Sequence, residues 1–171
     1  PHYFTLTDEA VKKYGAQAIM QPPLRPEDDR QAVIEYLRND VIDVIATDHA
    51  PHLLADKYQE LTEVARGMVG LETSVPLVMT ELVLKNKLTV KQMVEKMSCN
   101  PAKIVHLDKG HLSVGAAADV TIIDPKLTEI IDKNKFASKG RNTPYHGWKL
   151  TGIPIYTIVD GRIVMRQREL L

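Results

Sequence analysis

The sequence predicts an α/β fold over its first part and a β-rich segment after it, and three observations support this prediction. Two apolar runs, at residues 16–20 and 41–47, flank a stretch with the apolar periodicity of a helix. Further helical stretches follow, as far as residue 109. Beyond that point the apolar residues come in short strand-like runs between turns. We therefore divide the chain into an α/β part, 1–109, and a β-rich part, 110–171.

The α/β part is expected to begin with a strand, a helix and a second strand. The apolar run at 16–20 is short and is stopped by two prolines, as in a buried strand. Residues 26–40 predict a helix, because acidic residues favour its amino-terminal end and apolar residues share one face. The run at 41–47 is β-branched and apolar on both faces, which is typical of a parallel strand. A right-handed crossover then brings the polar stretches that follow both strands, 21–25 and 48–52, to one edge of the sheet.

Three more helices and a hairpin are expected further along the chain. Residues 74–87 and 90–97 have helical periodicity, and Thr89 opens the second of these stretches with a capping box. Asn100 followed by a proline predicts the start of another helix. Near the end, Asp160–Gly161 between two apolar runs is a strong β-hairpin signal.

Composition excludes several classes of function. Lys plus Arg and Asp plus Glu each number 22, so no net charge draws the chain toward nucleic acid or an anionic membrane. No stretch reaches the roughly 18 apolar residues of a membrane helix. Cys99 is the only cysteine, which rules out an internal disulfide and fits a reducing, cytoplasmic environment. The chain opens at Pro1 inside a motif-like run, and we expect it to be the later part of a longer protein.

Asp48 is the strongest candidate for a site residue, because it directly follows the predicted strand 41–47, where catalytic residues gather in α/β barrels. Its carboxylate can bind a metal or act as a general base, although an aspartate at a strand end also caps turns. Adjacent strand positions face opposite sides, so His49 is expected to have a structural role. His52 follows the turn at Pro51 and can return to the site to bind an anionic substrate. The alternative for His52 is a solvated loop histidine.

Other polar residues stand near these predicted strand ends. Gln21 opens a stiff loop with two prolines, which suits the holding of a polar side chain. Arg25 is expected to pair with the acids of the helix at 26–40. Gly67 and Gly70 permit a close approach of the backbone. Four histidines are dispersed along the sequence, without a second ligand-type residue at metal spacing: His2, His106, His111 and His146.

Six motifs resemble, in order, the C-terminal motifs of dihydroorotases, and together they cover nearly the whole chain. They are Pro1–Thr7, Pro22–Arg25, Ile45–His52, Gly67–Thr73, Asn100–Ile104 and Asn142–Tyr145. Allantoinases and hydantoinases share this outline. An aspartate followed four residues later by His52 is closest to dihydroorotase.

The resemblance implies that the chain is the C-terminal part of a (β/α)8 TIM-type barrel followed by a small β-rich domain. Such enzymes interconvert N-carbamoyl-L-aspartate and L-dihydroorotate in pyrimidine synthesis, with zinc, a single ion or a pair, that activates hydroxide. Asp48 matches the family's last metal ligand and general acid/base, so it is the expected catalytic and metal-binding residue. His52 matches a residue that binds the substrate carboxylate. Arg66 and Gly67 match a loop whose backbone holds the pyrimidine ring.

Two positions depart from the family pattern. Gln21 stands where an asparagine that touches the substrate is common, and its extra methylene shifts the amide by about 1.5 Å. Arg66 replaces a common aromatic residue. The family's remaining metal ligands precede Pro1, so the chain alone is expected to be inactive and to work with the missing N-terminal barrel portion.

The resemblance also suggests partners and alternatives. A homo-oligomer is expected, and aspartate transcarbamoylase is a partner that the family suggests. Because Gln21 and Arg66 depart from the pattern, a non-catalytic dihydroorotase-like subunit that is kept for assembly is one alternative to the enzyme. A related allantoinase or hydantoinase is the other.

Overall fold

The computed structural model describes residues 1–60 and 62–171. The α-helices are α1 (His2–Thr5), α2 (Ala10–Tyr14), α3 (Glu27–Arg38), α4 (Leu54–Lys57), α5 (Leu71–Val78), α6 (Val90–Val94) and α7 (Asn100–Ile104). Short 3₁₀ turns lie at Gly15–Ala18 and Lys133–Lys135, and π-helical turns lie at Met79–Val83 and Glu95–Cys99. The strands are β1 (Val120–Ile130), β2 (Lys149–Val159), β3 (Arg162–Arg166) and β4 (Glu169–Leu170).

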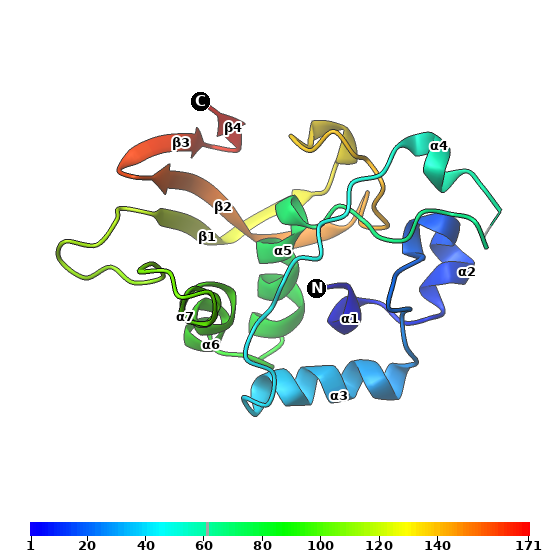
Figure 1. The fold of residues 1–171 in the computed structure, drawn as a ribbon, viewed down its shortest axis with the longest axis horizontal. Helices are drawn as coiled ribbons and strands as arrows, with labels where there is room; N and C mark the ends of the chain where they lie inside the picture. Colours follow the sequence, from blue (N-terminus) through cyan, green and yellow to red (C-terminus); the bar gives the residue numbers. More distant parts are fainter. Residues whose placement is uncertain (61) are drawn as a thin grey trace.

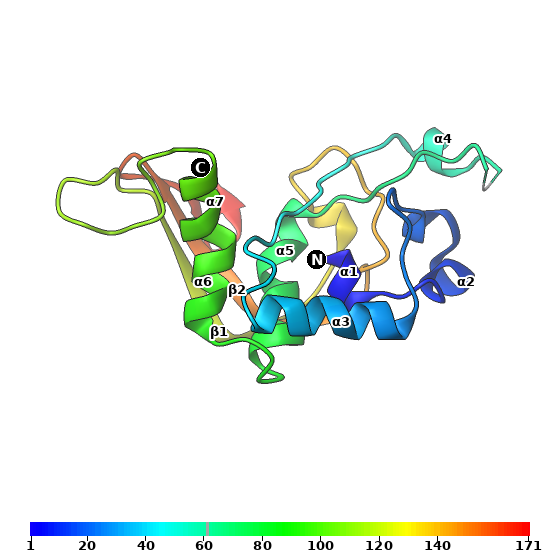
Figure 2. The same cartoon turned by 60° about the horizontal axis from the view of Figure 1, so that its bottom comes forward.

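The strands form one antiparallel sheet in the order β1–β2–β3–β4, which lies at one side of the molecule (Figure 1). Helix α5 packs on β2 in the middle of the molecule, and α3 runs along the edge away from the sheet. Figure 2 shows α6 and α7 continuing each other as one rod beside the sheet. The amino terminus lies near the centre, where α1 contacts α3.

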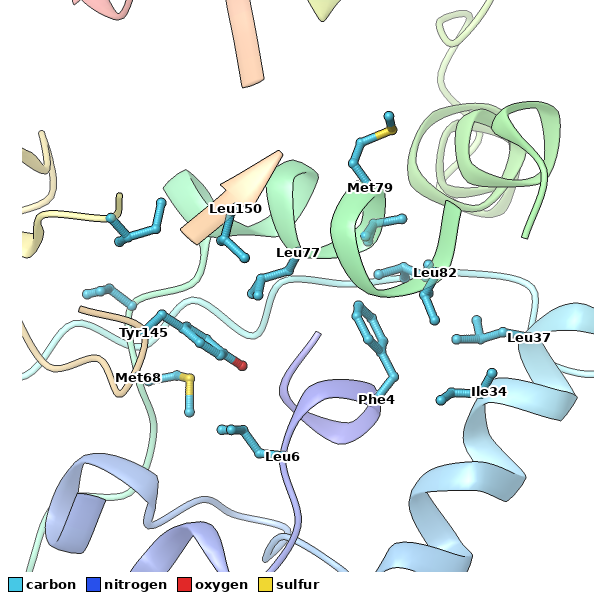
Figure 3. Packing of buried hydrophobic residues seen from close by; sticks show 14 of the residues in the cluster. Phe4, Leu6, Ile34, Leu37, Met68, Leu77, Met79, Leu82, Tyr145 and Leu150 are labelled. Atoms are coloured by element: carbon cyan, nitrogen blue, oxygen red, sulfur yellow. The ribbon is translucent and has the colours of Figure 1, made fainter. Parts of the chain in front are cut away.

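The buried core joins residues from both ends of the chain (Figure 3). Phe4 of α1, Leu77 of α5 and Leu150 of β2 are each at most 2% exposed. Tyr145 is also buried, and its hydroxyl lies 2.7 Å from the Thr5 hydroxyl. Burial of each such apolar side chain contributes about 1.5–3 kcal/mol. The segment that leads into β2 therefore belongs to the same packed core as the amino-terminal helices.

The predicted strand–helix–strand unit is only partly correct. Helix α3 confirms the helix expected at 26–40. The strands expected at 16–20 and 41–47 do not form: the first overlaps a 3₁₀ turn, and the second has no strand partner among the described residues. A strand needs a hydrogen-bonding neighbour, and here the Ile45 amide donates instead to the Lys96 carbonyl at 2.9 Å. The pattern of apolar residues in one segment does not show whether another segment lies beside it to form a sheet.

Helix α5 begins earlier than predicted. The expected range was 74–87, whereas the helix starts at Leu71 and passes through a π-helical turn that ends at Val83. The cause is a cap that comes from another part of the chain, because the His49 Nδ1 accepts hydrogen bonds from the amides of Gly70 and Leu71 at 3.1 and 3.4 Å. These contacts satisfy amides that would otherwise lack a partner at a helix start.

The helices predicted at 90–97 and from Asn100 are one continuous helix, from α6 through a π-helical turn to α7. The capping box is confirmed, since the Gln92 amide donates to the Thr89 hydroxyl at 3.1 Å. Helix α7 begins at Asn100, as predicted, but the cap predicted there is wrong, because the turn Glu95–Cys99 runs directly into α7. The side-chain amide of Asn100 donates instead to the Asp43 carbonyl at 2.9 Å.

The described strands all lie beyond residue 119, within the part that is predicted to be β-rich. The hairpin predicted at Asp160–Gly161 is confirmed, because Val159 of β2 pairs with Arg162 of β3 across it. The division into two domains at residue 109 stays a prediction. In the described part of the chain, no helix is long and apolar enough to cross a membrane.

Candidate metal and substrate site

Asp48 stands at a sharp turn of the backbone. Its φ of 51° lies in the left-handed region, which aspartate tolerates better than most residues. Its carboxylate is about half exposed. The next side chain, His49, points to Gly70 and caps α5, so the structural role predicted for His49 is confirmed.

His2 lies beside Asp48, with its Nε2 3.8 Å from the Asp48 Oδ2. The histidine is 2% exposed, and this nitrogen has no hydrogen-bond partner among the described residues. The distance is too long for a hydrogen bond. Zinc bonds to nitrogen and to oxygen are each roughly 2 Å long, so two ligands of one ion lie about 3–4 Å apart. The pair therefore fits a shared metal ion.

The protonation state of His2 suits a metal ligand. Burial is the main cause that lowers the pKa of His2 to about 4, and Asp48 opposes this shift. A neutral imidazole keeps a lone pair for a metal, whereas an imidazolium has none.

The spacing of histidines in the sequence does not mark His2 as a candidate metal ligand, because only the fold brings α1 to Asp48. The one available signal is that His2 belongs to the motif Pro1–Thr7. No group of three or more His, Cys, Asp or Glu side chains surrounds a metal position in residues 1–60 and 62–171. Catalytic zinc sites use three protein ligands, so His2 and Asp48 alone would not complete such a site.

The two residues that depart from the family pattern contact each other. The Arg66 Nη1 donates to the Gln21 Oε1 at 2.9 Å, and both residues are exposed. An asparagine at position 21 would be one methylene shorter and would fall short of this contact. The two departures are therefore coupled in the fold.

His52 is held at two points. Its backbone amide donates to the Asn142 Oδ1 at 3.0 Å, and its ring Nε2 lies 2.9 Å from the Arg66 carbonyl. A carbonyl only accepts hydrogen bonds, so Nε2 carries the proton of the neutral ring and Nδ1 keeps the lone pair. Nδ1 can therefore donate to an anionic ligand only when the ring is an imidazolium.

Gly67 lies where two loops touch. Its φ is 123°, and a Cβ built there would lie 2.6 Å from the Ala50 Cβ, which confirms the close approach expected of this glycine. Its amide donates to the Ile19 carbonyl at 2.9 Å. Its carbonyl accepts from Lys57 and Asn142. Its amide and carbonyl are both engaged, so Gly67 offers no free hydrogen-bonding group, and the space that a side chain would fill is taken by Ala50 of the neighbouring loop.

Lys57 is a buried cation beside this loop. It is 2% exposed, and its Nζ donates to the carbonyls of Ala65 and Gly67 at 2.7 and 3.0 Å. Burial lowers the pKa of Lys57 to about 8. Lysine is seldom fully buried, and its place between two loop carbonyls indicates that it fixes the loop. Nothing in the sequence marks this residue, because its partners are backbone atoms.

The remaining candidates lie elsewhere. Arg25 pairs with Asp29 at 2.8 Å, which confirms its expected role at the start of α3. His111 lies 3.0 Å from the Asp108 carboxylate, and His146 lies on the loop before β2. These histidines stay unassigned.

The sequence model of the amidohydrolase family matches residues 1–164 of the chain. A curated dihydroorotase of Acetivibrio thermocellus is 50% identical over 171 residues, which is 100% of this chain and 40% of the relative. A dihydroorotase of Pelotomaculum thermopropionicum is 55% identical over 168 residues, 98% of this chain and 39% of the relative. The chain thus spans about two fifths of the length of these curated relatives.

Solved structures agree with the predicted fold. The L-hydantoinase (dihydropyrimidinase) from Arthrobacter aurescens matches with a TM-score of 0.94 and 32% identity, over 100% of this chain and 39% of that one. A dihydropyrimidinase from Brevibacillus agri matches with a TM-score of 0.93 and 24% identity, over 100% and 39%. These neighbours are TIM-barrel proteins and the chain corresponds to their C-terminal part, so the predicted fold class is confirmed. Amidohydrolases and dihydroorotases are generally metal-dependent.

Proposed function

Because the chain belongs to the amidohydrolase family, we propose that the complete protein is a dihydroorotase. Such an enzyme interconverts L-dihydroorotate and N-carbamoyl-L-aspartate in pyrimidine synthesis by opening or closing a cyclic amide. The observation that carries the proposal is the pair His2 and Asp48 at 3.8 Å, in a chain that is 50% identical to a curated dihydroorotase over its whole length.

Zinc suits this pair, because it accepts both imidazole nitrogen and carboxylate oxygen. His2 and Asp48 would hold one side of the site, and further ligands from the complete protein would hold the other. When bound, one or two zinc ions supply a Lewis acid that polarises the amide carbonyl and activates water near neutral pH.

Asp48 moves the proton in this proposal. Its carboxylate accepts a proton from the attacking water and returns it to the ring nitrogen as the C–N bond breaks. The ring carbonyl carbon becomes a carboxylate, and the nitrogen becomes the amino group of the carbamoyl product. Ring closure follows the same steps in reverse. The half-exposed carboxylate is accessible to both water and substrate.

The other loop residues bind the substrate in this proposal. The His52 ring, when protonated, binds the carboxylate of dihydroorotate, and the Arg66 guanidinium on the neighbouring loop is a further cation. Gln21 holds Arg66 and presents its amide to the ring. Gly67 lets its loop lie close to the loop that carries His52, because a side chain there would collide with Ala50.

Turnover of L-dihydroorotate by the complete protein tests this function. The protein is freed of metal with a chelator, and turnover is measured before and after zinc is restored. We expect ring opening that depends on zinc. A folded, zinc-loaded protein that leaves dihydroorotate unchanged contradicts the proposal and favours the non-catalytic subunit.

A hydantoinase is the second candidate, because the L-hydantoinase structure matches the whole chain with a TM-score of 0.94. Hydantoin and dihydroorotate both contain a cyclic amide, but only dihydroorotate carries a ring carboxylate for His52 to bind. A higher kcat/KM for dihydroorotate than for hydantoin favours the dihydroorotase, and the reverse order favours the hydantoinase.

For the complete protein we further propose a cytoplasmic homo-oligomer that associates with aspartate transcarbamoylase, with a domain boundary near residue 109. The single cysteine supports the reducing compartment. Light scattering of the purified protein, alone and mixed with aspartate transcarbamoylase, tests both kinds of assembly.

A further inference from the structure

Asn142 lies in the segment that leads into β2, in a motif to which the proposed function gives no role. The residue is 2% exposed. Its Nδ2 donates to the Ala50 carbonyl at 2.9 Å and to the Gly67 carbonyl at 3.2 Å. Its Oδ1 accepts from the His52 amide at 3.0 Å. Both N–H groups and the oxygen of the side chain are therefore engaged.

The partners of this side chain come from two different loops. The first loop, 50–52, carries His52, and the second, 65–69, carries Gly67. An aspartate in place of Asn142 would lack both donors, and an apolar side chain of the same size would lack all three contacts. The three contacts thus require an amide at this position.

The segment around Asn142 lies directly on these loops. Its backbone carbonyl accepts from the Val69 amide at 2.9 Å. Gly140 has no room for a side chain, because a Cβ built there would lie 2.7 Å from the Pro51 Cβ. Lys57 donates to the second loop only. The two loops also contact each other directly, since the Ala50 amide donates to the Met68 carbonyl at 2.9 Å and the His52 ring lies against the Arg66 carbonyl. Among the described contacts, Asn142 adds a side chain from outside the two loops that bonds to both.

We propose that Asn142 is a positioning residue that, together with the direct contacts of the two loops, holds them at a fixed spacing and thereby holds His52 at a fixed distance from the loop of Gly67. The meaning of this spacing for substrate binding rests on the proposed function, whereas the contacts belong to the fold. The C-terminal segment thus helps to build a site whose ligand-binding residues come from the α/β part.

Amide hydrogen exchange in the complete protein tests this role without an assay of activity. Asn142→Ala is expected to speed exchange at His52 and across 65–69 by about tenfold, because buried hydrogen bonds are lost. Lys57→Met is expected to speed exchange across 65–69 alone. Thr80→Val is the matched control, since it removes two hydrogen bonds to β2 and should leave both loops unchanged.

Asn142→Asp is the second variant, and it tests whether Asn142 holds the two loops if Asn142→Ala does not fold. It keeps the acceptor for the His52 amide and loses both donors, so exchange should rise more across 65–69 than at His52. A folded variant of either kind that exchanges at the wild-type rate in both loops overturns the proposal.

Steady-state kinetics connects the loop spacing to substrate binding. For Asn142→Ala we expect KM for dihydroorotate to rise about tenfold, with a smaller change in kcat and an unchanged zinc content. A wild-type KM in a variant with loosened loops overturns this connection. If the wild-type protein does not turn over dihydroorotate, the proposed function fails, and the exchange experiment still decides whether Asn142 holds the loops.

Discussion

The two halves of the site differ in how their polar groups are satisfied. In the half formed by His2 and Asp48, a buried imidazole nitrogen bonds to no atom that the structure describes. In the other half, the His52 ring, the Gly67 carbonyl and the Lys57 ammonium all have hydrogen-bond partners. Buried polar groups are normally paired. The difference supports the proposal that the first half binds an additional ligand, whereas the hydrogen bonds of the second half are completed within the chain.

Asp48→Asn should have the largest effect, because it keeps the shape of the side chain but removes its negative charge and basicity. Loss of a general acid/base costs about 10²–10⁴-fold, so kcat for dihydroorotate in the complete protein should fall by about 10³-fold. Asp43→Asn alters an exposed aspartate of the same segment and serves as the control. Equal kcat values for Asp48→Asn and Asp43→Asn would show that Asp48 is not the general acid/base.

His2→Gln should weaken zinc binding and should leave the contacts of His52, Gly67 and Lys57 unchanged. Loss of a residue that only orients a metal ligand lowers metal affinity by about 10–100-fold. Loss of a ligand itself should cost at least as much, so we expect the zinc affinity, measured by competition with a chelator, to fall by about 100-fold or more. His111→Gln is the control, since that ring pairs with Asp108. A zinc affinity equal to that of the wild type in His2→Gln would contradict the proposal that His2 binds the metal.

Lys57→Met should reveal the buried cation of the second half through the pH dependence of stability. The pKa of Lys57 is about 8 in the folded chain, against 10.5 for an ordinary lysine. Between these pH values the unfolded chain binds more protons, so the free energy of unfolding of the wild type should rise with pH.

The Lys57→Met variant lacks this titration, so its deficit in stability should be about 1–3 kcal/mol near pH 7, where a loop carbonyl loses its donor, and larger at pH 10. Denaturant titrations of both proteins at several pH values measure the difference. A deficit that does not grow above pH 8 argues against a lowered pKa.

The contact between Gln21 and Arg66 should give the smallest effect, because both side chains are exposed. A double-mutant cycle with Gln21→Asn and Arg66→Met, with KM for dihydroorotate as the readout, should give a coupling energy of about 0.5–1 kcal/mol. Strictly additive changes in the two variants would mean that the departures act separately.

The sequence predicts the parts of the fold whose determinants are local. Helix α3, the capping box at Thr89 and the hairpin at Asp160–Gly161 each depend on residues that are close in the chain, and all three form. The strands predicted at 16–20 and 41–47 depend on partners elsewhere, and they do not form. An apolar run indicates that a segment tends to be buried, but it does not show which backbone will pair with it.

The same rule separates the site residues that the sequence marks from those that it does not. Asp48 and His52 are visible because they follow an apolar run and stand in a dense polar cluster. His2, Lys57 and Asn142 are not visible, because an imidazole, an ammonium and an amide gain their roles only when distant loops are folded against them. Family motifs include His2 and Asn142, but a motif alone does not say what the residue contacts.

Anomalous diffraction at the zinc edge, from crystals of the zinc-loaded complete protein, tests most directly whether His2 and Asp48 share a metal. We predict an anomalous peak between the Nε2 of His2 and the Oδ2 of Asp48, about 2 Å from each atom. A well-occupied zinc peak beyond bonding distance of either side chain would contradict this assignment.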